Sequence, residues 1–469
     1  MMPKTPARRV PARTAVTSVP SRRESWKSCD EDGLKLVLHG SLMGKGRSSV
    51  DDPPQSGATR WTVIKACRSC GSSHLAPVLS LGAMPLANAL VPVGREAEED
   101  PRFPLDLVFC AGCSLLQITE TVSPEILFRD YRYFSSFSDT MVKHARAIAT
   151  RMKESLGLGP GSLAAEIASN DGYLLKGYVD LDVPVLGIEP ARNIAKLAEE
   201  KGVRTIAEFF GKDLAVRLAS EGKRADVLHA NNVMAHVPDI NGVVAGVAAF
   251  LAPGGVFVTE SPHVVPMIDH VEFDTIYHEH LFYYSLTAQK ALYERHGLAI
   301  ADVEQLPIHG GSIRTFVKHA DAAKPTDAVK RLLDEEAAWG VATIDAYRTF
   351  AERVGRLGVE LTTRLRELKK QGKTIAAYGA AAKGTTLLNH FGIGKELIDY
   401  VVDRSTEKQG RLVPGVRLPI IAPSALFEKR PDVTLLLTWN FADEILAQQK
   451  AYRDAGGKFI IPIPEVREV

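Results

Sequence analysis

The stretch LAAEIASNDG, residues 163–172, fixes the class of fold that we expect. It opens on a short apolar run, LAAEIAS, which is typical of a buried parallel strand. Asn170, Asp171 and Gly172 then form a small polar turn before a helix that begins near Tyr173. At the carboxyl edge of a parallel sheet, such a turn lets a nucleotide-type cofactor approach the main chain. A tight turn without any ligand is the alternative interpretation of these residues.

Further apolar runs follow the same pattern, with helix-like segments between them. They are PVLGIEP (184–190), ADVLHANNV (225–233) and GGVFVTES (254–261). Strands that alternate with helices predict an α/β domain built on a doubly wound sheet. We also expect Phe282–Ser285 and Ile313–His319 to add antiparallel edge strands.

A second α/β unit follows Gly372. Its predicted strands are TIAAYGA (374–380), LIDYVVD (397–403), DVTLLLTW (432–439) and KFIIPI (458–463). Between the two units, residues 325–370 carry apolar side chains at helical spacing, which predicts a long amphipathic helical stretch. Its heptads are irregular, so a packed connector is favoured over a partner-binding coiled coil.

Polar residues at the strand ends of the first unit predict the cofactor contacts. The second strand ends in Glu189, whose carboxylate is placed to accept hydrogen bonds from both hydroxyls of a ribose. The expected cofactor-binding residues are Glu166, Ala168, Asn170, Asp171, Gly172, Glu189, Asn231 and Asn232. The turn lacks the glycines that cradle a pyrophosphate, so an NAD-type site is disfavoured. S-adenosylmethionine, which has no pyrophosphate, fits this turn better.

The cysteines indicate a metal site. Cys67-Arg-Ser-Cys70 and Cys110-Ala-Gly-Cys113 are two C-x-x-C turns about forty residues apart. Tetrahedral zinc takes four thiolates at about 2.3 Å, and each C-x-x-C turn delivers two of them. Four thiolates leave no open coordination position, so we expect a structural zinc. Two redox dithiols are the alternative. A nucleic-acid-binding ribbon is disfavoured because no Lys/Arg excess surrounds the turns.

Composition excludes several classes of protein. The chain has 469 residues, a formal net charge of +1 and 45% hydrophobic residues, which gives no argument for a nucleic-acid or membrane partner. We see neither the apolar run of about 20 residues that a membrane span needs nor the apolar core of a signal peptide. Five cysteines are too few for a disulfide framework, which favours the cytoplasm. Residues 1–60, rich in Arg, Ser, Pro and Gly without a period, predict a disordered basic tail.

Ordered stretches from about Ala66 to the C-terminus resemble the three-domain NDP-sugar C-methyltransferases. They are ACRSCGSSHLAPVLSLGAMPLANAL, PLDLVFCAGCSLLQ, DYRYFSSFSDTMVKHA, EIASNDGYLL, GIEPARNIA, YHEHLFYYS, HGGSIRTF and YGAAAKGTTLLN. The resemblance implies a small zinc-binding N-terminal domain, a central class I methyltransferase domain and a C-terminal Rossmann-like domain. After the tail we therefore place a zinc-binding domain at 61–140, a methyltransferase domain at 141–320, a helical connector at 321–372 and the C-terminal domain at 373–469.

Tyr277-His278-Glu279-His280 is the richest chemical cluster in the chain. The resemblance implies that His280 is a catalytic base, with Tyr277 and Glu279 beside it. Methylation of a carbon next to a ketone needs a base, and histidine, with a pKa of about 6.5, can be neutral and basic at working pH. Tyr277 could donate to the developing enolate, and Glu279 could orient the imidazole. A hydrogen-bonded core histidine and a catalytic zinc on His278 and His280 are the alternatives.

The substrate contacts are expected on several segments. Tyr378 ends a strand, Lys383 opens the next helix, and Asp403 closes the following strand. This Rossmann-like pattern alone suggests NAD. With the resemblance it suggests the nucleotide end of a sugar nucleotide, with Lys383 near the diphosphate. A purely structural turn is the alternative. The remaining expected contacts are Asn88, Tyr133, His309 and Arg314, although Tyr133 could serve aromatic packing and Arg314 could face solvent.

The function that follows is methyl transfer from S-adenosylmethionine to a carbon of a nucleotide-activated keto sugar, as in deoxysugar biosynthesis. Methylation of oxygen or nitrogen on the same scaffold is a second hypothesis. A non-catalytic binding protein is the third, and a failure to bind S-adenosylmethionine would favour it.

Overall fold

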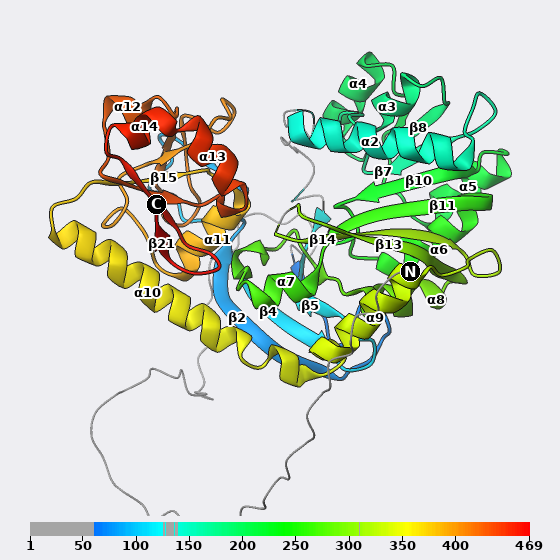
Figure 1. The fold of residues 1–469 in the computed structure, drawn as a ribbon, viewed down its shortest axis with the longest axis horizontal. Helices are drawn as coiled ribbons and strands as arrows, with labels where there is room; N and C mark the ends of the chain where they lie inside the picture. The colour runs from blue at the N-terminus through cyan, green and yellow to red at the C-terminus, as the bar shows by residue number, and fades with distance from the viewer. Residues whose placement is uncertain (1–60, 125–126, 128–135, 137–138, 309) are drawn as a thin grey trace, which may run out of the picture. The chain divides into compact units, whose positions relative to one another are not determined.

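The computed structural model of the chain (Figure 1) describes residues 61–124, 127, 136, 139–308 and 310–469. The predicted tail and two predicted substrate contacts, Tyr133 and His309, lie outside the described residues. No helix in the described ranges combines the length and the apolar character that a membrane crossing requires.

The central domain is built on a seven-stranded sheet with the order β13-β14-β11-β10-β7-β8-β9. Its strands are β7 (Ala164–Ile167), β8 (Val185–Ile188), β9 (Thr205–Ile206), β10 (Ala225–Asn231), β11 (Leu251–Pro262), β13 (Leu298–Leu306) and β14 (Ser312–His319). β14 runs antiparallel to both of its neighbours, whereas the strands from β11 to β9 are parallel. A parallel sheet with this one reversed strand confirms the expected class I methyltransferase fold.

Helices cover both faces of this sheet because the side chains of each strand alternate between the faces. Ala164, Val227 and Val258 pack with α2 and α3, whereas Ala165, Leu228 and Phe257 belong to the core that contains α5, α6 and α8. The helices of this domain are α2 (Asp139–Leu156), α3 (Leu175–Val179), α4 (Arg192–Glu200), α5 (Lys212–Ser220), α6 (Ile240–Phe250), α7 (Val264–Asp269) and α8 (Leu286–Glu294). The 3-10 turn η2 (Phe273–Thr275) lies between α7 and α8 in the chain.

Both segments predicted as antiparallel edge strands are antiparallel strands, but neither forms an edge of the central sheet. β14 is antiparallel but lies inside the sheet, because β13, which was not predicted, forms the edge. β12 (Phe282–Tyr283) does not join the central sheet but pairs with β5 (Leu116–Ile118) of the N-terminal domain. Periodicity identifies a strand, but it does not identify the strand that pairs with it.

The N-terminal domain contains a four-stranded sheet with the order β12-β5-β4-β2 and a separate pair of strands. The elements are β1 (Trp61–Val63), β2 (Leu75–Pro85), β4 (Arg102–Cys110) and β6 (Glu120–Val122), in addition to β5 and β12. Between β2 and β4 the chain leaves this sheet, and β3 (Val91–Pro92) pairs with β17 (Arg411–Leu412) of the C-terminal domain. Sheets therefore continue across the predicted domain boundaries.

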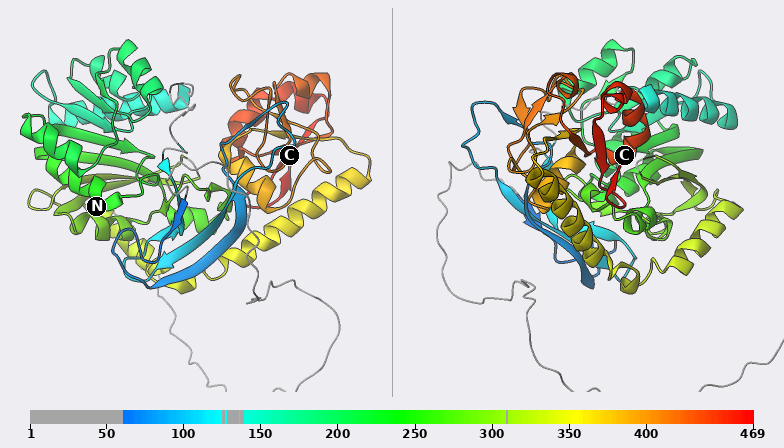
Figure 2. Two further views of the ribbon diagram at one scale, coloured as in Figure 1. Left: turned by 180° about the vertical axis from the view of Figure 1, so that it is seen from behind. Right: turned by 60° about the vertical axis from the view of Figure 1, so that its left-hand side comes forward.

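The predicted helical stretch at 325–370 is interrupted. It consists of α9 (Asp327–Trp339), the 3-10 turn η3 (Ile344–Tyr347) and α10 (Phe350–Lys370). Gly340 ends α9 with a φ of 95°, a left-handed conformation that glycine adopts easily. α10 packs against β2, and Figure 2 shows the two elements side by side.

The C-terminal domain has the second α/β sheet that the sequence predicted. Its order is β21-β20-β19-β15-β16-β18-β17-β3, and the strands from β20 to β18 are parallel. Its strands are β15 (Ile375–Tyr378), β16 (Val401–Val402), β17, β18 (Pro419–Ile421), β19 (Val433–Leu436), β20 (Lys458–Ile461) and β21 (Arg467–Glu468). Its helices are α11 (Ala382–His390), α12 (Ala425–Glu428), η4 (Trp439–Phe441), α13 (Ala442–Gln448) and α14 (Lys450–Asp454).

Candidate functional site

The cysteine side chains gather at one point of the N-terminal domain. The Sγ atoms of Cys67, Cys70, Cys110 and Cys113 all lie within 4.8 Å of one another. The Cys67–Cys113 and Cys70–Cys110 sulfur distances are 3.6 Å and 3.5 Å. Four sulfurs that surround one zinc ion at about 2.3 Å lie about 3.8 Å apart. The donor set therefore fits a zinc ion, and it is the one cluster of this kind in the described part of the chain.

Gln117 supports this cluster, and the sequence analysis did not identify it. Its buried side chain donates from Nε2 to Cys67 Sγ at 3.0 Å, and its Oε1 accepts from the Arg68 main-chain amide at 3.1 Å. Hydrogen bonds from the Cys113 thiol and from Gln117 lower the pKa of Cys67 to about 4. Gln117 belongs to β5, so the cysteine cluster is tied to the strand that pairs with β12, just after His280.

The polar turn after β7 has the predicted tight geometry. Ala168, Asn170 and Gly172 have φ values of 51°, 48° and 77°, all in the left-handed region. A Cβ atom on Gly172 would lie 2.9 Å from Val203 Cγ2, so this position needs glycine for space as well as for conformation. The main chain of the turn is therefore fixed by its packing.

Buried acids line this edge of the sheet. Glu189 accepts main-chain hydrogen bonds from Asn170 at 3.0 Å and Ala191 at 2.9 Å. Asp171 accepts from Ser136 and, at 2.7 Å, from Lys201 Nζ. Burial raises the pKa of Glu166 well above its usual value, and the charges of Glu189 and Asp171 add to the rise. Such a group of carboxyls favours a ligand that carries positive charge.

The unsatisfied acceptors at this edge test the fit of a cofactor. Glu166 Oε2, Ser169 Oγ, Asp171 Oδ1 and Asn231 Oδ1 are buried and have no hydrogen-bond partner among the described residues. Buried polar atoms normally have hydrogen-bond partners, so these four atoms indicate a ligand that donates hydrogen bonds. S-adenosylmethionine offers an ammonium, two ribose hydroxyls and a positive sulfonium, and the residues present fit it. Asn232, also predicted as a cofactor contact, has a φ of 56°. Its main-chain N–H donates to the main-chain carbonyl oxygen of Glu260.

Two hydrogen bonds fix the tautomer of His280 in its neutral form. Its Nδ1 lies 2.9 Å from the Thr275 carbonyl oxygen, and its Nε2 lies 2.8 Å from the Tyr277 hydroxyl oxygen. A carbonyl only accepts hydrogen bonds, so Nδ1 carries the hydrogen and Nε2 of the neutral ring carries the lone pair. Nε2 therefore accepts from Tyr277 and is the basic nitrogen.

Glu279 does not have the orienting role that we expected, because the Thr275 carbonyl accepts the Nδ1 hydrogen. The Glu279 carboxyl is buried and accepts from Asn88 Nδ2 at 2.7 Å. Burial raises the pKa of Glu279 to about 7. Asn88, predicted as a substrate contact, thus reaches the Tyr277–His280 motif from the N-terminal domain.

The other histidines near this motif have different surroundings. His278 Nε2 faces the Pro104 carbonyl at 3.0 Å and the Phe103 carbonyl at 3.3 Å, which favours a structural role over the alternative metal site with His280. The ring of His236, which the sequence analysis missed, lies 4.8 Å from that of His280. Burial lowers the pKa of His236 to about 4, so the ring beside the base is uncharged. The sequence offered one signal for His236, which is its position shortly after the predicted strand at 225–233.

The turn after β15 brings together the predicted residues of the C-terminal domain. Asp403 accepts main-chain hydrogen bonds from Ala380 at 2.7 Å and Ser405 at 2.8 Å. Lys383 Nζ lies 4.5 Å from the centre of the Trp439 ring and has no hydrogen-bond partner among the described residues. Tyr378 ends β15 and is buried beside Phe459. A buried ammonium without an acceptor is suited to an anion.

Arg314 is already occupied by protein acids. It is buried, with Nε 2.7 Å from Glu260 Oε1 and Nη1 2.9 Å from Glu304 Oε2. We therefore leave Arg314 out of the proposed substrate site, because a phosphate would have to displace these carboxylates.

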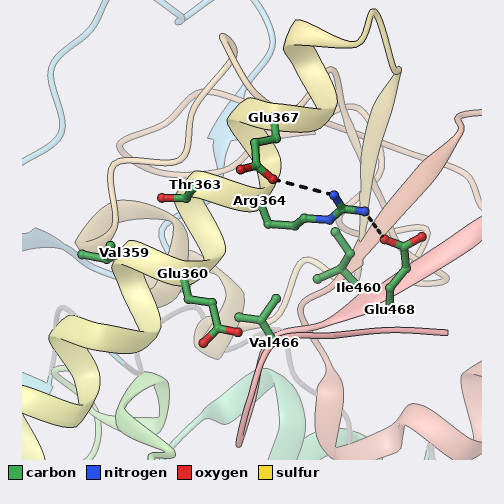
Figure 3. Close-up of a pocket in the computed structure, with 8 residues that line it drawn as sticks. All are labelled: Val359, Glu360, Thr363, Arg364, Glu367, Ile460, Val466 and Glu468. Carbon is green, nitrogen blue, oxygen red and sulfur yellow. Dashed lines mark hydrogen bonds and ion pairs between the residues drawn. The ribbon is translucent and has the colours of Figure 1, made fainter.

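A recess of about 610 Å³ lies elsewhere, between α10 and the end of the C-terminal sheet. Figure 3 shows that Arg364 is placed there between Glu367 and Glu468, at 3.8 Å and 2.6 Å. None of the predicted site residues lines this recess, and its one arginine is paired.

Comparison with known proteins gives matches along most of the chain. The family model described as "Putative zinc binding domain" matches residues 67–128, "Methyltransferase domain" matches 156–303, and "C-methyltransferase C-terminal domain" matches 307–464. C-methyltransferase NovU of Streptomyces niveus is 38% identical over 407 residues, which cover 87% of this chain and 97% of NovU.

Solved structures of methyltransferases match a part of the chain. Magnesium protoporphyrin IX methyltransferase of Synechocystis is 13% identical and covers 41% of this chain and 88% of its own, with a TM-score of 0.30. The CcbJ methyltransferase of Streptomyces caelestis is 14% identical and covers 38% and 89%, with a TM-score of 0.31. The three family models, in the order of the three predicted domains, agree with the NovU match over almost its whole length. The chain therefore belongs to the family of three-domain C-methyltransferases that includes NovU.

Proposed function

We propose that the enzyme transfers a methyl group from S-adenosylmethionine to a carbon beside the ketone of a nucleotide-linked keto sugar. The observation that carries this proposal is the arrangement at His280, whose basic Nε2 is prepared by the Thr275 carbonyl and faces the Tyr277 hydroxyl. Transfer to oxygen or nitrogen would not need a base that can form an enolate. The similarity to C-methyltransferase NovU also supports transfer to carbon.

The motif accounts for the movement of the proton. In this proposal the Tyr277 hydroxyl first turns from Nε2 to the ketone oxygen of the bound substrate, which exposes the Nε2 lone pair. His280 Nε2 then takes the proton from the carbon beside the ketone, and the electron pair of that C–H bond becomes the enolate. The Tyr277 hydroxyl donates to the enolate oxygen and stabilises its charge. The pKa of His236 is lowered to about 4, so this neighbouring ring adds no positive charge beside the protonated imidazole of His280.

S-adenosylmethionine, when bound, supplies the electrophilic methyl group that the enolate carbon takes. The residues that would hold it are those of the turn after β7, with Glu189 at the end of β8 and Asn231 at the end of β10. Their unsatisfied acceptors and buried acids suit its ammonium and sulfonium charges. The zinc ion would have a structural part only, because the four cysteine ligands fill its coordination positions.

The nucleotide part of the substrate is assigned to the turn after β15. Lys383, whose ammonium has no acceptor among the described residues, would meet the diphosphate there. The N-terminus of α11 begins at the same turn, and helix N-termini favour anions. Asn88 remains a proposed sugar contact, since it reaches Glu279 at the catalytic motif.

The test is a transfer assay with S-adenosylmethionine that carries a ¹³C-labelled methyl group and a panel of nucleotide-linked 4-keto-6-deoxy sugars. Product NMR locates the label in the wild type, in His280→Ala and in His74→Ala, which changes an exposed histidine. We expect a carbon-bound methyl group that is lost only in His280→Ala. A label on oxygen or nitrogen that survives in His280→Ala would contradict enolate chemistry. An absence of cofactor binding by calorimetry would contradict the methyltransferase site itself.

A further inference from the structure

The 3-10 turn η2 carries the group that orients the base. Thr275, its last residue, accepts the Nδ1 hydrogen of His280 at 2.9 Å. This hydrogen bond selects the tautomer in which Nε2 is basic. The position of η2 therefore decides whether the imidazole is ready to take a proton.

Residues of the C-terminal domain hold η2 in place. Trp439 Nε1 donates to Asp274 Oδ2 at 2.8 Å, and both side chains are buried. The ring of Phe273 lies 5.4 Å from that of His390 and 4.8 Å from that of Phe391. These contacts join the two residues before Thr275 to η4 and to the end of α11. Asp274 and Trp439 are 165 residues apart in sequence.

Lys383 shares this environment. Its ammonium lies over the Trp439 ring at 4.5 Å, and neither Lys383 Nζ nor Asp274 Oδ1 has a hydrogen-bond partner among the described residues. Burial raises the pKa of Asp274, and the Lys383 charge opposes this rise. The indole of Trp439 thus contacts both the lysine of the proposed diphosphate turn and the carboxyl of η2.

We propose that Asp274 and Trp439 are positioning residues, through which the C-terminal domain keeps the Thr275 carbonyl against His280 Nδ1. They do not touch the reacting atoms and act only through Thr275. The C-terminal domain then contributes to the chemical step in addition to binding the nucleotide. This inference rests on the proposed function, in which His280 is the base.

The variants are chosen to break the hydrogen bond between Trp439 and Asp274 from either side. Trp439→Phe removes the indole N–H but keeps a ring under Lys383, and Asp274→Ala removes the acceptor. Asp274→Asn keeps an acceptor and serves as the conservative variant. Trp339→Phe is the matched control, because Trp339 Nε1 also donates to a carboxylate at 3.0 Å, that of Asp269, which ends α7 and lies outside η2. Thermal unfolding of each variant checks that it is folded.

The first readout needs no substrate. Nitrogen NMR of histidine-labelled, full-length protein, with the His280 signals assigned by their loss in His280→Gln, reports the tautomer of the ring. We expect Trp439→Phe and Asp274→Ala to lose the pure Nδ1–H tautomer, and Asp274→Asn and Trp339→Phe to keep it. Unchanged His280 signals in a folded Trp439→Phe or Asp274→Ala protein would overturn the proposal.

The second readout is kinetic and uses the most active sugar nucleotide of the panel. A positioning role predicts that kcat falls about tenfold in Trp439→Phe, whereas KM changes little. A raised KM with an unchanged kcat would overturn the proposal, because it indicates a role in nucleotide binding alone. If the wild type transfers no methyl group to any sugar of the panel, the proposed function is contradicted for these substrates, and the NMR result still decides the positioning role.

Discussion

The hydroxyl oxygen of Tyr277 lies 2.8 Å from Nε2 of His280, the nitrogen that carries the lone pair. In the proposed mechanism the tyrosine has two successive partners, first His280 and then the oxygen of the substrate. That mechanism predicts separable effects for the two residues.

Tyr277→Phe separates them. It leaves the base in place but removes the donor to the enolate, so we expect kcat to fall by about 10²-fold. Exchange of the substrate C–H hydrogen in deuterated water, measured by NMR without S-adenosylmethionine, should slow to a similar extent. Tyr347→Phe changes a buried tyrosine of the connector whose hydroxyl donates to the Val341 carbonyl, and it serves as the control. Exchange at the wild-type rate in Tyr277→Phe would show that Tyr277 does not stabilise the enolate.

Glu279 gives a pH dependence to stability. Burial raises its pKa from 4.5 to about 7, so the folded state holds a proton that the unfolded state releases. The contribution of Glu279 to the free energy of unfolding is fully present below about pH 4.5. It is lost as the pH rises through 7, at up to roughly 1.4 kcal/mol per pH unit. We expect Glu279→Gln to gain stability relative to the wild type between pH 5 and pH 7. Urea unfolding at several pH values measures this difference, and parallel curves for the two proteins would contradict it.

Much of this architecture could be predicted from local patterns. Buried apolar runs identified the parallel strands of both sheets except the short strands β9 and β18, and the C-x-x-C spacing identified the cysteine cluster. These signals lie within a few residues. The contacts that assemble the site join residues far apart in the sequence. Asn88 and Glu279 are 191 residues apart, and Gln117 and Cys67 are 50 apart. The first pairing depends on how β3 and β12 join sheets of other domains, and the second on how β5 pairs with β4 within the N-terminal domain. No periodicity encodes either arrangement.

Gln117 should control the affinity for zinc. Its Nε2–H bond to Cys67 Sγ stabilises the thiolate, so Gln117→Ala should weaken zinc binding by about 10-fold to 100-fold. Competition with a chromophoric chelator measures the affinity, and Gln448→Ala, on the surface of α13, is the control. Equal affinities would show that the amide only packs against the cluster.

Gly172, in the turn after β7, has a matched control in Gly202, in the turn between α4 and β9. Gly172 and Gly202 have φ values of 77° and 82°, but only Gly172 has a neighbour, Val203, within 4 Å of a built Cβ. Gly202→Ala should cost about 1 kcal/mol from backbone strain alone. Gly172→Ala should cost more and should also weaken S-adenosylmethionine binding, because the shifted turn carries Asn170 and Asp171. Calorimetric titration tests this, and equal cofactor affinity in the two variants would place the cofactor away from the turn.

Arg314 should matter for stability and not for the substrate. Its guanidinium compensates the buried carboxylate of Glu260, which otherwise has His144 as its partner. Removal of one partner from a buried ion pair leaves an uncompensated charge and costs about 3–5 kcal/mol, so Arg314→Ala should unfold at much lower urea concentration. Arg314→Leu with Glu260→Leu removes both charges and should recover part of that loss. At a temperature where Arg314→Ala is folded, KM for the sugar nucleotide should equal the wild-type value. A raised KM with normal stability would return Arg314 to the substrate site, because it would mean that the guanidinium meets a phosphate.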